Sequence, residues 1–469
     1  MNFSSSAFLL LAGFAVFLRQ LTLRWPGLLN AVLLTTSLIF FGWANPEYLV
    51  LLLAAIFMNF TIARQISSYD RENLNRHFLL FIAIFFNLGT MALFKFWPAV
   101  SYLLKGVGQF QLQTKSMDLL IPVGLSFFLL ETMGYVSDVY WGRTKPQKNL
   151  VSFAVYVSFF PKIICGPLVS AEDFFAQLGR RPKLTVAHIA NNLFLILSGV
   201  FLRVVLASSF ERETAVYWIP GHLSFDHALV SWMTLWIFYW EIFSDLFGYS
   251  LIAIGVAGLL GFSLPASFDF PYLATSLKDF WQSWNMTLTS WGKRHFIEPL
   301  ANLAGNGFGN RIKIICLGFV LYGLWHGLKW PAFFWGLWQG LFLVLELRGN
   351  PRRLGALGQV LGWAKVQIIV LFGWLLLRSD NFENVAYHLK NIAFGNYSFE
   401  PLRGHIWNYY FLQPMILSGL LVLAHARILL ARRAKLKVGP IEKAAYAGIM
   451  AYLTLTAYGK SFPVYYFRF

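Results

Sequence analysis

The sequence predicts an all-α integral membrane protein, and both its composition and its apolar segments support this prediction. Of the 469 residues, 57% are hydrophobic and 18% are aromatic, while only 13% are charged, about half the charged share of an ordinary soluble domain. Segments of roughly 20 mostly apolar residues recur along the chain, and a bilayer core about 30 Å thick requires helices of that length. We therefore expect a single polytopic membrane domain over residues 1–469. It divides into N-terminal helices (1–118), a central core (119–380) and C-terminal helices (381–469).

The positive charge of the chain is explained by a membrane rather than by nucleic acid. The formal net charge is +17, from 38 Lys and Arg against 21 Asp and Glu. Basic residues crowd the loops between apolar segments, as expected where cytoplasmic loops face anionic lipid headgroups. No nucleic-acid-binding motif accompanies the charge. We therefore expect membrane lipid and no nucleic acid as a partner, with the densest basic run, residues 427–443, on the cytoplasmic side.

The first four helices are expected in the N-terminal region. The segment Phe8 to Leu18 has no basic stretch before it and no small-residue cleavage site after it, so it is interpreted as a transmembrane helix and not as a signal peptide. The first strongly charged loop, Arg64 to Arg76, is a candidate for the cytoplasmic side. The predicted helices are 7–20, 28–43, 47–62 and 78–98.

From residue 119 the apolar sequence carries polar and helix-breaking residues. The run 119–142 contains Glu131 and Asp138, and carboxylates at that depth should face protein or a water-filled cavity. The next apolar segment, 150–167, is interrupted by Pro161 and Pro167. A broken backbone at membrane depth is tolerated only where it lines a cavity or is buried in protein.

The second half of the chain contains further spans and one aromatic stretch of lower hydropathy. Residues 227–243 and 245–262 are predicted as either one hairpin or one long kinked helix. In 263–310 the tryptophans Trp281, Trp284 and Trp291 fall near one side of a helix, which favours an interfacial helix with its rings at headgroup level. The remaining predicted spans are 189–209, 312–328, 331–347, 364–378, 407–430 and 444–458.

His326 is the strongest candidate for a catalytic side chain. It lies in the apolar and aromatic stretch Leu321 to Gly340, where an ionisable imidazole is costly and therefore indicates function. A structural role, donating to a carbonyl on a neighbouring helix, remains open. Gly323 and Gly327 are expected to open space beside the ring, and Trp325 to line a substrate channel.

A second candidate site surrounds Asn285, in the stretch 267–300. One interpretation is an interfacial helix whose cations extend to the headgroups. The other is an amide that orients an acyl group, with Lys293 and Arg294 meeting an anionic donor. Trp281 and Trp284 are expected to line the same channel.

Other chemistry-bearing residues give weaker indications. Asp245 lies with Glu241 in apolar sequence; a structural salt bridge or helix cap is favoured for this pair, and Asp245 is kept as a channel-lining candidate. Cys165 and Cys316 are too isolated for a zinc site or a disulfide framework. We expect no metal and no bound cofactor. The sequence has no G-x-S-x-G, P-loop or H-E-x-x-H motif, which leaves base-assisted group transfer.

Six ordered segments between residues 119 and 380 resemble the membrane-bound O-acyltransferase family, and especially its bacterial polysaccharide-acetylating branch. The resemblance implies a ring of transmembrane and re-entrant helices around a central catalytic channel. It also places His326 at the position of the catalytic histidine. The segments are IPVGLSFFLLETMGYVSDVYWG, FFPKIICGPLVS, SDLFGYSLIAIG, FDFPYLATSLKDFWQSW, GLWHGLKWPAFFWGLWQG and GWLLLRS.

The chain departs from the resemblance at one position. Many polysaccharide-acylating relatives have F-W-x-x-W-H where this chain has FWQSWN, so Asn285 replaces a second histidine. Other branches carry Asn or Asp there. His326 is then the single catalytic imidazole, accepting a hydroxyl proton as general base, while Asn285 donates to the acyl carbonyl.

The resemblance implies a membrane O-acyltransferase that moves an acetyl group across the bacterial inner membrane to an exported polysaccharide such as cellulose or alginate. The expected donor is a cytoplasmic thioester, acetyl-CoA. Expected partners are periplasmic acetyltransferase or acceptor proteins and a polysaccharide synthase or export complex. Two alternatives stay open: transfer of D-alanine or another acyl group to a cell-envelope polymer, and a proton-coupled transporter or flippase for a lipid-linked sugar.

Overall fold

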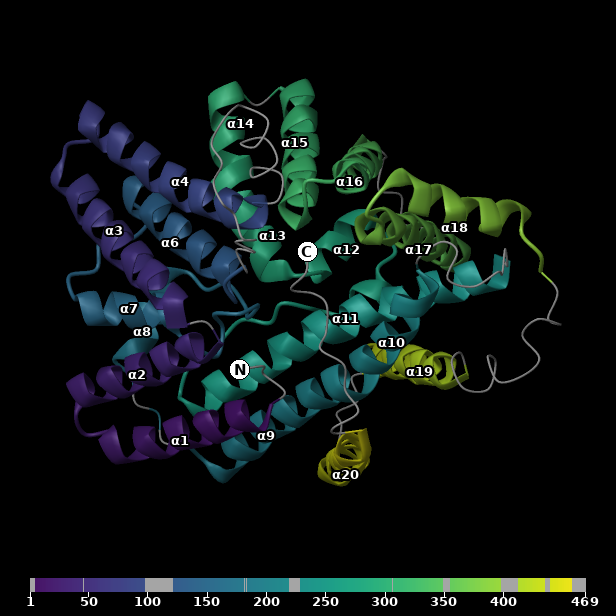
Figure 1. The fold of residues 1–469 in the computed structure, drawn as a ribbon, viewed down its shortest axis with the longest axis horizontal. Coiled ribbons are helices and arrows are strands. Elements are labelled where there is room, and N and C mark those ends of the chain that lie inside the picture. Colours follow the sequence, from purple (N-terminus) through teal and green to yellow (C-terminus); the bar gives the residue numbers. More distant parts are fainter. Residues whose placement is uncertain are drawn as a thin grey trace, which may run out of the picture. The chain divides into compact units, whose positions relative to one another are not determined.

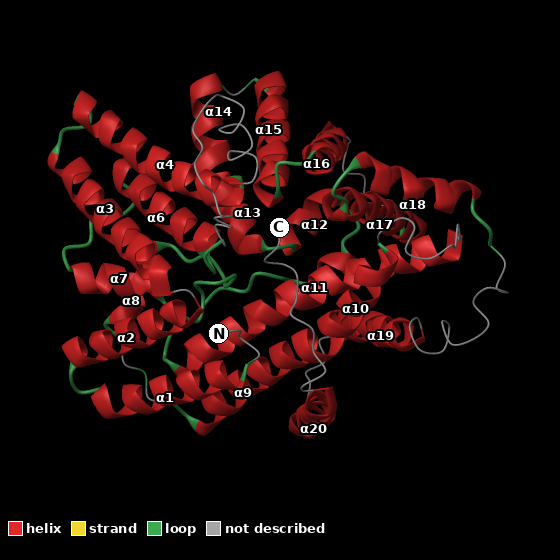
Figure 2. Cartoon of the chain, in the orientation of Figure 1, coloured by secondary structure: helices red, strands yellow, loops and turns green. Residues whose placement is uncertain are grey.

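In the computed structural model, the secondary-structure elements within the described part of the chain are all helices, which confirms the predicted fold class (Figure 2). Six helices there are long and apolar enough to cross a membrane, and two shorter apolar helices accompany them, Ser6–Thr22 and Leu412–Ile428. The protein is therefore a multi-pass membrane protein. The structure describes residues 5–44, 46–97, 121–180, 182, 184–218, 228–305, 307–348, 355–397, 412–434 and 439–457.

The chain divides into two compact units. Unit 1 comprises Met1–Ile196 and Ile252–Pro265, and unit 2 comprises Leu197–Leu251 and Ala266–Phe469. The division of the chain at residues 118 and 380 stays a prediction.

Unit 1 begins with the four helices that hydropathy predicts. Several of its helices start at a side chain that accepts a backbone N–H bond, as Ser5 does from Phe8 and Ser170 does from Asp173, which satisfies donors that the first helical turn leaves unpaired. The helices, labelled in Figure 1, are α1 (Ser6–Thr22), α2 (Pro26–Ala44), the short 3₁₀ turn η1 (Pro46–Tyr48), α3 (Leu49–Ser68), α4 (Leu74–Lys95), α6 (Leu125–Tyr140), α7 (Leu150–Ser158), α8 (Ala171–Leu178) and the first part of α9 (Val186–Phe201).

Buried amides and a hydroxyl join α3, α4 and α6, which lie side by side (Figure 1). The Asn87 amide donates to the Asn59 side-chain oxygen at 2.8 Å, and the Thr132 hydroxyl donates to the Asn87 side-chain oxygen at 2.9 Å. Both asparagine amides also donate to backbone carbonyls one turn earlier in their own helices. Such bonds stabilise helix association in an apolar environment, where polar groups have few other partners.

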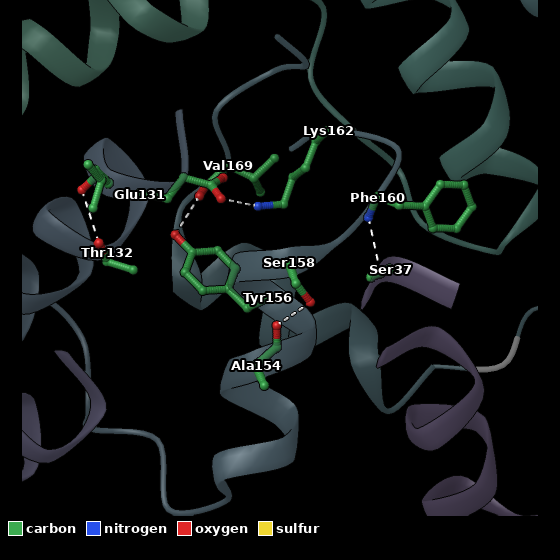
Figure 3. A network of polar contacts seen from close by, with 10 residues as sticks. Ser37, Glu131, Thr132, Ala154, Tyr156, Ser158, Phe160, Lys162 and Val169 are labelled. Atoms are coloured by element: carbon green, nitrogen blue, oxygen red, sulfur yellow. Dashed lines mark hydrogen bonds and ion pairs between the residues drawn. The ribbon is translucent and has the colours of Figure 1, made fainter. Parts of the chain in front are cut away.

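The broken segment after α7 is buried in protein, as the two prolines predict (Figure 3). The ammonium of Lys162 forms an ion pair with Glu131 of α6 and lies 4.5 Å from the ring centre of Tyr156. The Tyr156 hydroxyl donates to the carbonyl of Val169 at 3.0 Å. The Tyr156 hydroxyl thus satisfies a backbone carbonyl that a regular helix would have bonded within itself.

Unit 2 contains the candidate site and is built from helices of very different lengths. Residues 228–259 form one continuous helix, so the long-helix alternative for 227–262 is confirmed and the hairpin is wrong. The elements are the π-helical turn η2 (Leu202–Ala207), α10 (Ser208–Tyr217), α11 (Ala228–Leu259, whose last turns belong to unit 1), η3 (Pro271–Leu273), α12 (Leu277–Ser283), α13 (Met286–Gly292), η4 (Lys293–Ile297), α14 (Glu298–Ala304), α15 (Phe308–His326), α16 (Trp330–Arg348), α17 (Ala356–Arg378), α18 (Phe382–Phe394), α19 (Leu412–Ala434) and α20 (Pro440–Ala457).

The stretch 263–310 is not one interfacial helix, so that prediction is wrong. It is divided among η3, α12, α13, η4 and α14. Trp281 and Trp284 are 4% and 2% exposed and pack among other rings, and only Trp291 is partly exposed. The helix breaks at Asn285 because this residue adopts a left-handed backbone conformation, with φ 39° and ψ 52°.

Candidate active site

Close contact between α15 and α16 positions His326. A Cβ atom on Gly323 would lie 2.1 Å from the carbonyl oxygen of Ala332, so only glycine allows the two helices to approach this closely. The space that was expected from the sequence beside the imidazole at Gly323 is therefore filled by the packing of α15 against α16. Gly327 has an extended backbone and follows the last residue of α15.

The imidazole of His326 lies in a cage of aromatic rings. It is 9% exposed. The ring centres of Trp325, Tyr322 and Trp335 lie 4.8, 5.2 and 5.9 Å from its own. His326 is also the last residue of α15. The carbonyl end of a helix carries partial negative charge, which favours the positive charge that an imidazole gains on accepting a proton.

A series of ring contacts connects His326 with the region of Asn285. Trp335 stacks on Trp374 of α17 with ring centres 6.3 Å apart, and Trp374 lies 5.0 Å from Trp284. Trp281 meets Trp335 edge-on at 5.9 Å. Asn285 follows Trp284 directly and is 7% exposed. The structure therefore brings Trp281, Trp284 and Trp325 into one aromatic cluster with His326.

The N-terminus of α12 is held by a carboxylate from α16. Glu346 accepts the backbone N–H groups of Leu277 and Lys278, both at 3.0 Å, and its own position is supported by Lys365 of α17 at 2.9 Å. A carboxylate at a helix N-terminus is favoured by the unpaired N–H groups and by the helix dipole. Because α12 carries Trp281 and leads into Asn285, Glu346 indirectly fixes this side of the site.

Tyr272 anchors the segment that precedes α12. Its hydroxyl donates to the carbonyl of Tyr239 in α11 at 2.6 Å. Its own carbonyl accepts from Trp363 at 2.9 Å and from Gln367 at 3.2 Å, both in α17. The two ends of one residue thus bind two different helices.

The backbone at Asn285 is unusual and is supported on both sides. The N–H of Met286 donates to the carbonyl of Ser267 at 2.7 Å, and that of Asp269 donates to the carbonyl of Ser283 at 2.9 Å. Left-handed backbone is uncommon outside glycine, and Asn, Asp and His are the other residues enriched in it. Residues held in such a conformation cluster at functional sites.

Asp245 forms a structural salt bridge, which is one of the two roles favoured for it from the sequence. It forms a buried ion pair with Arg203 at 2.9 Å, and the Arg203 guanidinium lies 3.5 Å from the ring centre of Tyr249. Glu241 accepts from the Thr214 hydroxyl at 2.5 Å. Arg203 was not among the sequence candidates, although it is a lone arginine in the predicted apolar span 189–209.

The remaining candidate cations lie in the π-helical turn η4. Lys293 is exposed and Arg294 is partly exposed. The contact of these two cations with an anionic donor stays a prediction. Within the described ranges, no group of three or more His, Cys, Asp or Glu residues could hold a metal ion.

Tyr322, Trp335 and Trp374 belong to the aromatic cluster around His326, but they were not identified from the sequence. A tryptophan or tyrosine in an apolar helix does not by itself indicate a functional site.

Comparison with known proteins identifies the family. Residues 28–348 match the model of the MBOAT, membrane-bound O-acyltransferase, family. The chain belongs to this family. The matched region includes both His326 and Asn285, and membership makes the protein a membrane O-acyltransferase.

Several bacterial members of the membrane-bound O-acyltransferase family are similar over most of their length. A protein named "Probable alginate O-acetylase" from Azotobacter vinelandii is 28% identical over 86% of this chain and 80% of its own length. A peptidoglycan O-acetyltransferase from Helicobacter pylori is 26% identical over 82% of this chain and 78% of its own. A teichoic acid D-alanyltransferase from Bacillus subtilis is 23% identical over 58% of this chain and 69% of its own.

Proposed function

We propose that this enzyme transfers an acetyl group from acetyl-CoA to an exported cell-envelope polysaccharide at the bacterial inner membrane. The observation that carries the proposal is the family match, because it spans the aromatic cage of His326 together with Asn285. The similarity to proteins named as O-acetylases, over more than 80% of this chain, supports acetyl as the transferred group.

The residues of the cage suit base-assisted acyl transfer. His326 accepts the proton of the attacking hydroxyl, a role that contributes about 10²- to 10⁴-fold in rate. Asn285 donates to the carbonyl oxygen as negative charge develops there, which contributes on the order of 10² to 10³. The surrounding tryptophan and tyrosine rings limit access of water, so these polar interactions act in a medium of low dielectric.

The acceptor is proposed to be a partner protein or intermediate that passes the acetyl group to the polymer. Periplasmic acetyltransferase or acceptor proteins and the polysaccharide synthase or export complex are the proposed partners. Cellulose and alginate are the proposed polymers. Transfer of D-alanine is the second candidate, and it is less favoured because the D-alanyltransferase of Bacillus subtilis matches only 58% of this chain.

The proposal is tested with membrane vesicles of the host, supplied with acetyl-CoA labelled in the acetyl group. Label should enter the envelope polymer with the unchanged chain and should be lost with His326→Ala. The matched control is His77→Ala, an exposed histidine of α4. Full labelling by the His326→Ala protein would contradict the base assignment. Labelling from a D-alanyl thioester but not from acetyl-CoA would replace the acetyl proposal with its alternative.

A further inference from the structure

Trp335 of α16 is enclosed by glycines of two neighbouring helices. A Cβ atom on Gly323 of α15 would lie 3.2 Å from Cε3 of the Trp335 indole, and one on Gly373 of α17 would lie 3.4 Å from its Nε1. The indole therefore packs against the bare backbone of both helices, and it is 1% exposed. Because protein interiors are packed as densely as organic crystals, a ring enclosed in this way has no space to swing aside. Trp335 is thus a rigid wall between α15 and α17.

This wall is in direct contact with the imidazole of His326. The two ring centres are 5.9 Å apart, with the ring planes at 82° to each other. Tyr322 contacts both rings, and its centre lies 5.2 Å from that of His326 and 5.4 Å from that of Trp335. Aromatic rings in contact have their centres about 4.5 to 7 Å apart. No space therefore remains for an acyl chain between the imidazole and Trp335.

The space behind Trp335 is also filled by rings. The ring centres of Trp281 and Trp374 lie 5.9 and 6.3 Å from that of Trp335, and the two residues are 4% and 2% exposed. Trp374 in turn lies 5.0 Å from Trp284. The described side chains thus form successive layers of rings on this side of His326. A chain of several carbons that entered here would have to displace a buried ring, and a packed core resists added volume.

We propose that Trp335 limits the length of the acyl group that this enzyme transfers, by closing the aromatic side of His326 to chains longer than acetyl. The proposal rests on the proposed acyl transfer and deepens it, because it names a residue that determines specificity for the acyl group. In the proposed arrangement the coenzyme A sulfur and the attacking hydroxyl occupy two sides of the acyl carbon, and the chain of the acyl group is directed towards Trp335. A methyl group fits against the indole, whereas further carbons meet it.

The discrimination should be steep. A filled apolar pocket discriminates against one added methylene group by about 10- to 200-fold in kcat/KM. A butyryl thioester has two methylene groups more than an acetyl thioester, so the unchanged protein should use it at least about 100-fold less well. Truncating Trp335 should relax this limit, because an apolar cavity opened inside a protein stays dry and takes up apolar groups of matching size.

The test compares acetyl-CoA with butyryl-CoA in membrane vesicles of the host. The readout is free coenzyme A, which is released when the acceptor hydroxyl oxygen bonds to the acyl carbon, the carbon–sulfur bond breaks and the hydroxyl proton passes through His326 to the thiolate. This readout reports the transfer whichever acceptor receives the group. Release by vesicles that contain the His326→Ala protein is subtracted. The measured quantity is the ratio of the two rates within one preparation, so a lower amount of folded protein cancels out.

Trp335→Leu should raise the ratio of the butyryl rate to the acetyl rate at least about 10-fold. Trp218→Leu is the matched control, because it truncates another buried tryptophan of unit 2, one that packs against Phe238 and His388. This control should leave the ratio unchanged. Trp335→Phe removes a smaller part of the wall, and it is compared with propionyl-CoA in place of butyryl-CoA if the leucine variant is absent from the membrane.

Two results would overturn the chain-length proposal and leave the proposed function intact. One is an unchanged protein that uses butyryl-CoA as fast as acetyl-CoA. The other is a Trp335 variant whose ratio is no higher than that of the unchanged protein and of Trp218→Leu. If the unchanged protein releases no more coenzyme A from acetyl-CoA than the His326→Ala protein does, the proposed function fails, and the chain-length proposal fails with it.

Discussion

Gly323 of α15 touches the backbone of Ala332 in α16 so closely that no Cβ atom fits between them. Gly323→Ala should therefore push the two helices apart and destabilise the fold by about 1–3 kcal/mol or more, as overpacking does. His326 belongs to α15 and Trp335 to α16, and their rings contact each other. Moving the two helices apart should disturb this contact, so acetylation should fall as well. Gly309→Ala, in the same helix but with open space around it, should change neither unfolding temperature nor rate. Equal behaviour of the two variants would contradict the close contact.

Asn285 combines an amide with a left-handed backbone, and two substitutions separate these properties. Asn285→Gly keeps the backbone but removes the amide, so acetylation should fall about 10²- to 10³-fold if the amide is an oxyanion donor. Asn285→Ala should show the same loss and a further destabilisation of roughly 1–2 kcal/mol from the backbone. Rates and unfolding temperatures measured together distinguish the two effects. An active Asn285→Gly enzyme would reduce Asn285 to a purely structural residue.

Asn285→His should retain a substantial part of the activity. Histidine tolerates the left-handed conformation better than most residues do, and its ring can donate a hydrogen bond in place of the amide. The acetylation rate of Asn285→His is compared with that of Asn285→Leu, whose side chain has a volume similar to that of histidine but no hydrogen-bond donor. Equal rates for the two variants would show that no donor is required here.

Glu346 connects three helices of the site, and Glu346→Gln should weaken that connection. The neutral amide loses the charge-assisted bonds to the backbone of Leu277 and Lys278 and to the ammonium of Lys365. A stability loss of about 1–3 kcal/mol is expected, as for hydrogen bonds to charged groups. Acetylation should fall with it, since α12 carries Trp281. Glu298→Gln, at an exposed glutamate of α14, is the control and should have little effect.

The ion pair between Lys162 and Glu131 should show a strong non-additive effect. Lys162→Met leaves a carboxylate buried without its cation, which should cost about 3–5 kcal/mol of folding free energy. Replacing both residues, with Lys162→Met and Glu131→Leu together, should cost much less than the sum of the single changes. Unfolding of the three purified variants in detergent measures this coupling. Additive losses would indicate that the two charges do not depend on each other.

His388 should make stability depend on pH. Burial lowers the pKa of His388 below its ordinary value of 6.5, although the hydrogen bond to the Trp218 carbonyl acts in the opposite direction. The ring also faces the Ser231 hydroxyl of α11, and the Arg378 guanidinium lies 5.7 Å from the ring centre of Trp218. Below pH 6.5 the unfolded chain therefore binds more protons than the folded one at this residue.

The stabilising contribution of His388 is then complete above about pH 6.5 and is lost as the pH falls below that value. The unfolding temperature measured between pH 5 and pH 8 should decline on the acid side. His388→Gln should reduce this decline, whereas the control His77→Gln should leave it unchanged. A decline of the same size in all three proteins would exclude His388 as its source.

The transmembrane helices were predictable because each must satisfy its own backbone in an apolar medium, so hydropathy and length alone mark them. The helix α18 was not predicted. It is short and amphipathic, with Val385, His388 and Asn391 buried along one face, and its mean hydropathy is too low for a span. The periodicity of these positions could have revealed it.

Within the site, His326 was predictable because an ionisable group stands out in apolar sequence. Asn285 was a candidate as an amide within an aromatic stretch, but the sequence does not show that its backbone is left-handed. The close packing of Trp335 and Gln339 against Gly373 depends on the contact between α16 and α17, which spacing within one helix cannot reveal. The partner of Asp245 was missed for the same reason, because Arg203 is 42 residues away in the chain.

The π-helical turn η2 restricts insertions and deletions. Arg203 lies inside this turn and pairs with Asp245, whereas Thr214 follows the turn and donates a hydrogen bond to Glu241, so one position within the turn and one after it must both face α11. A π turn holds one residue more than an α turn, and each residue rotates a helix by about 100°. Removing one residue between Arg203 and Thr214 would turn one of the two away from its partner. Natural variants of this protein should therefore exchange side chains here while keeping the number of residues fixed.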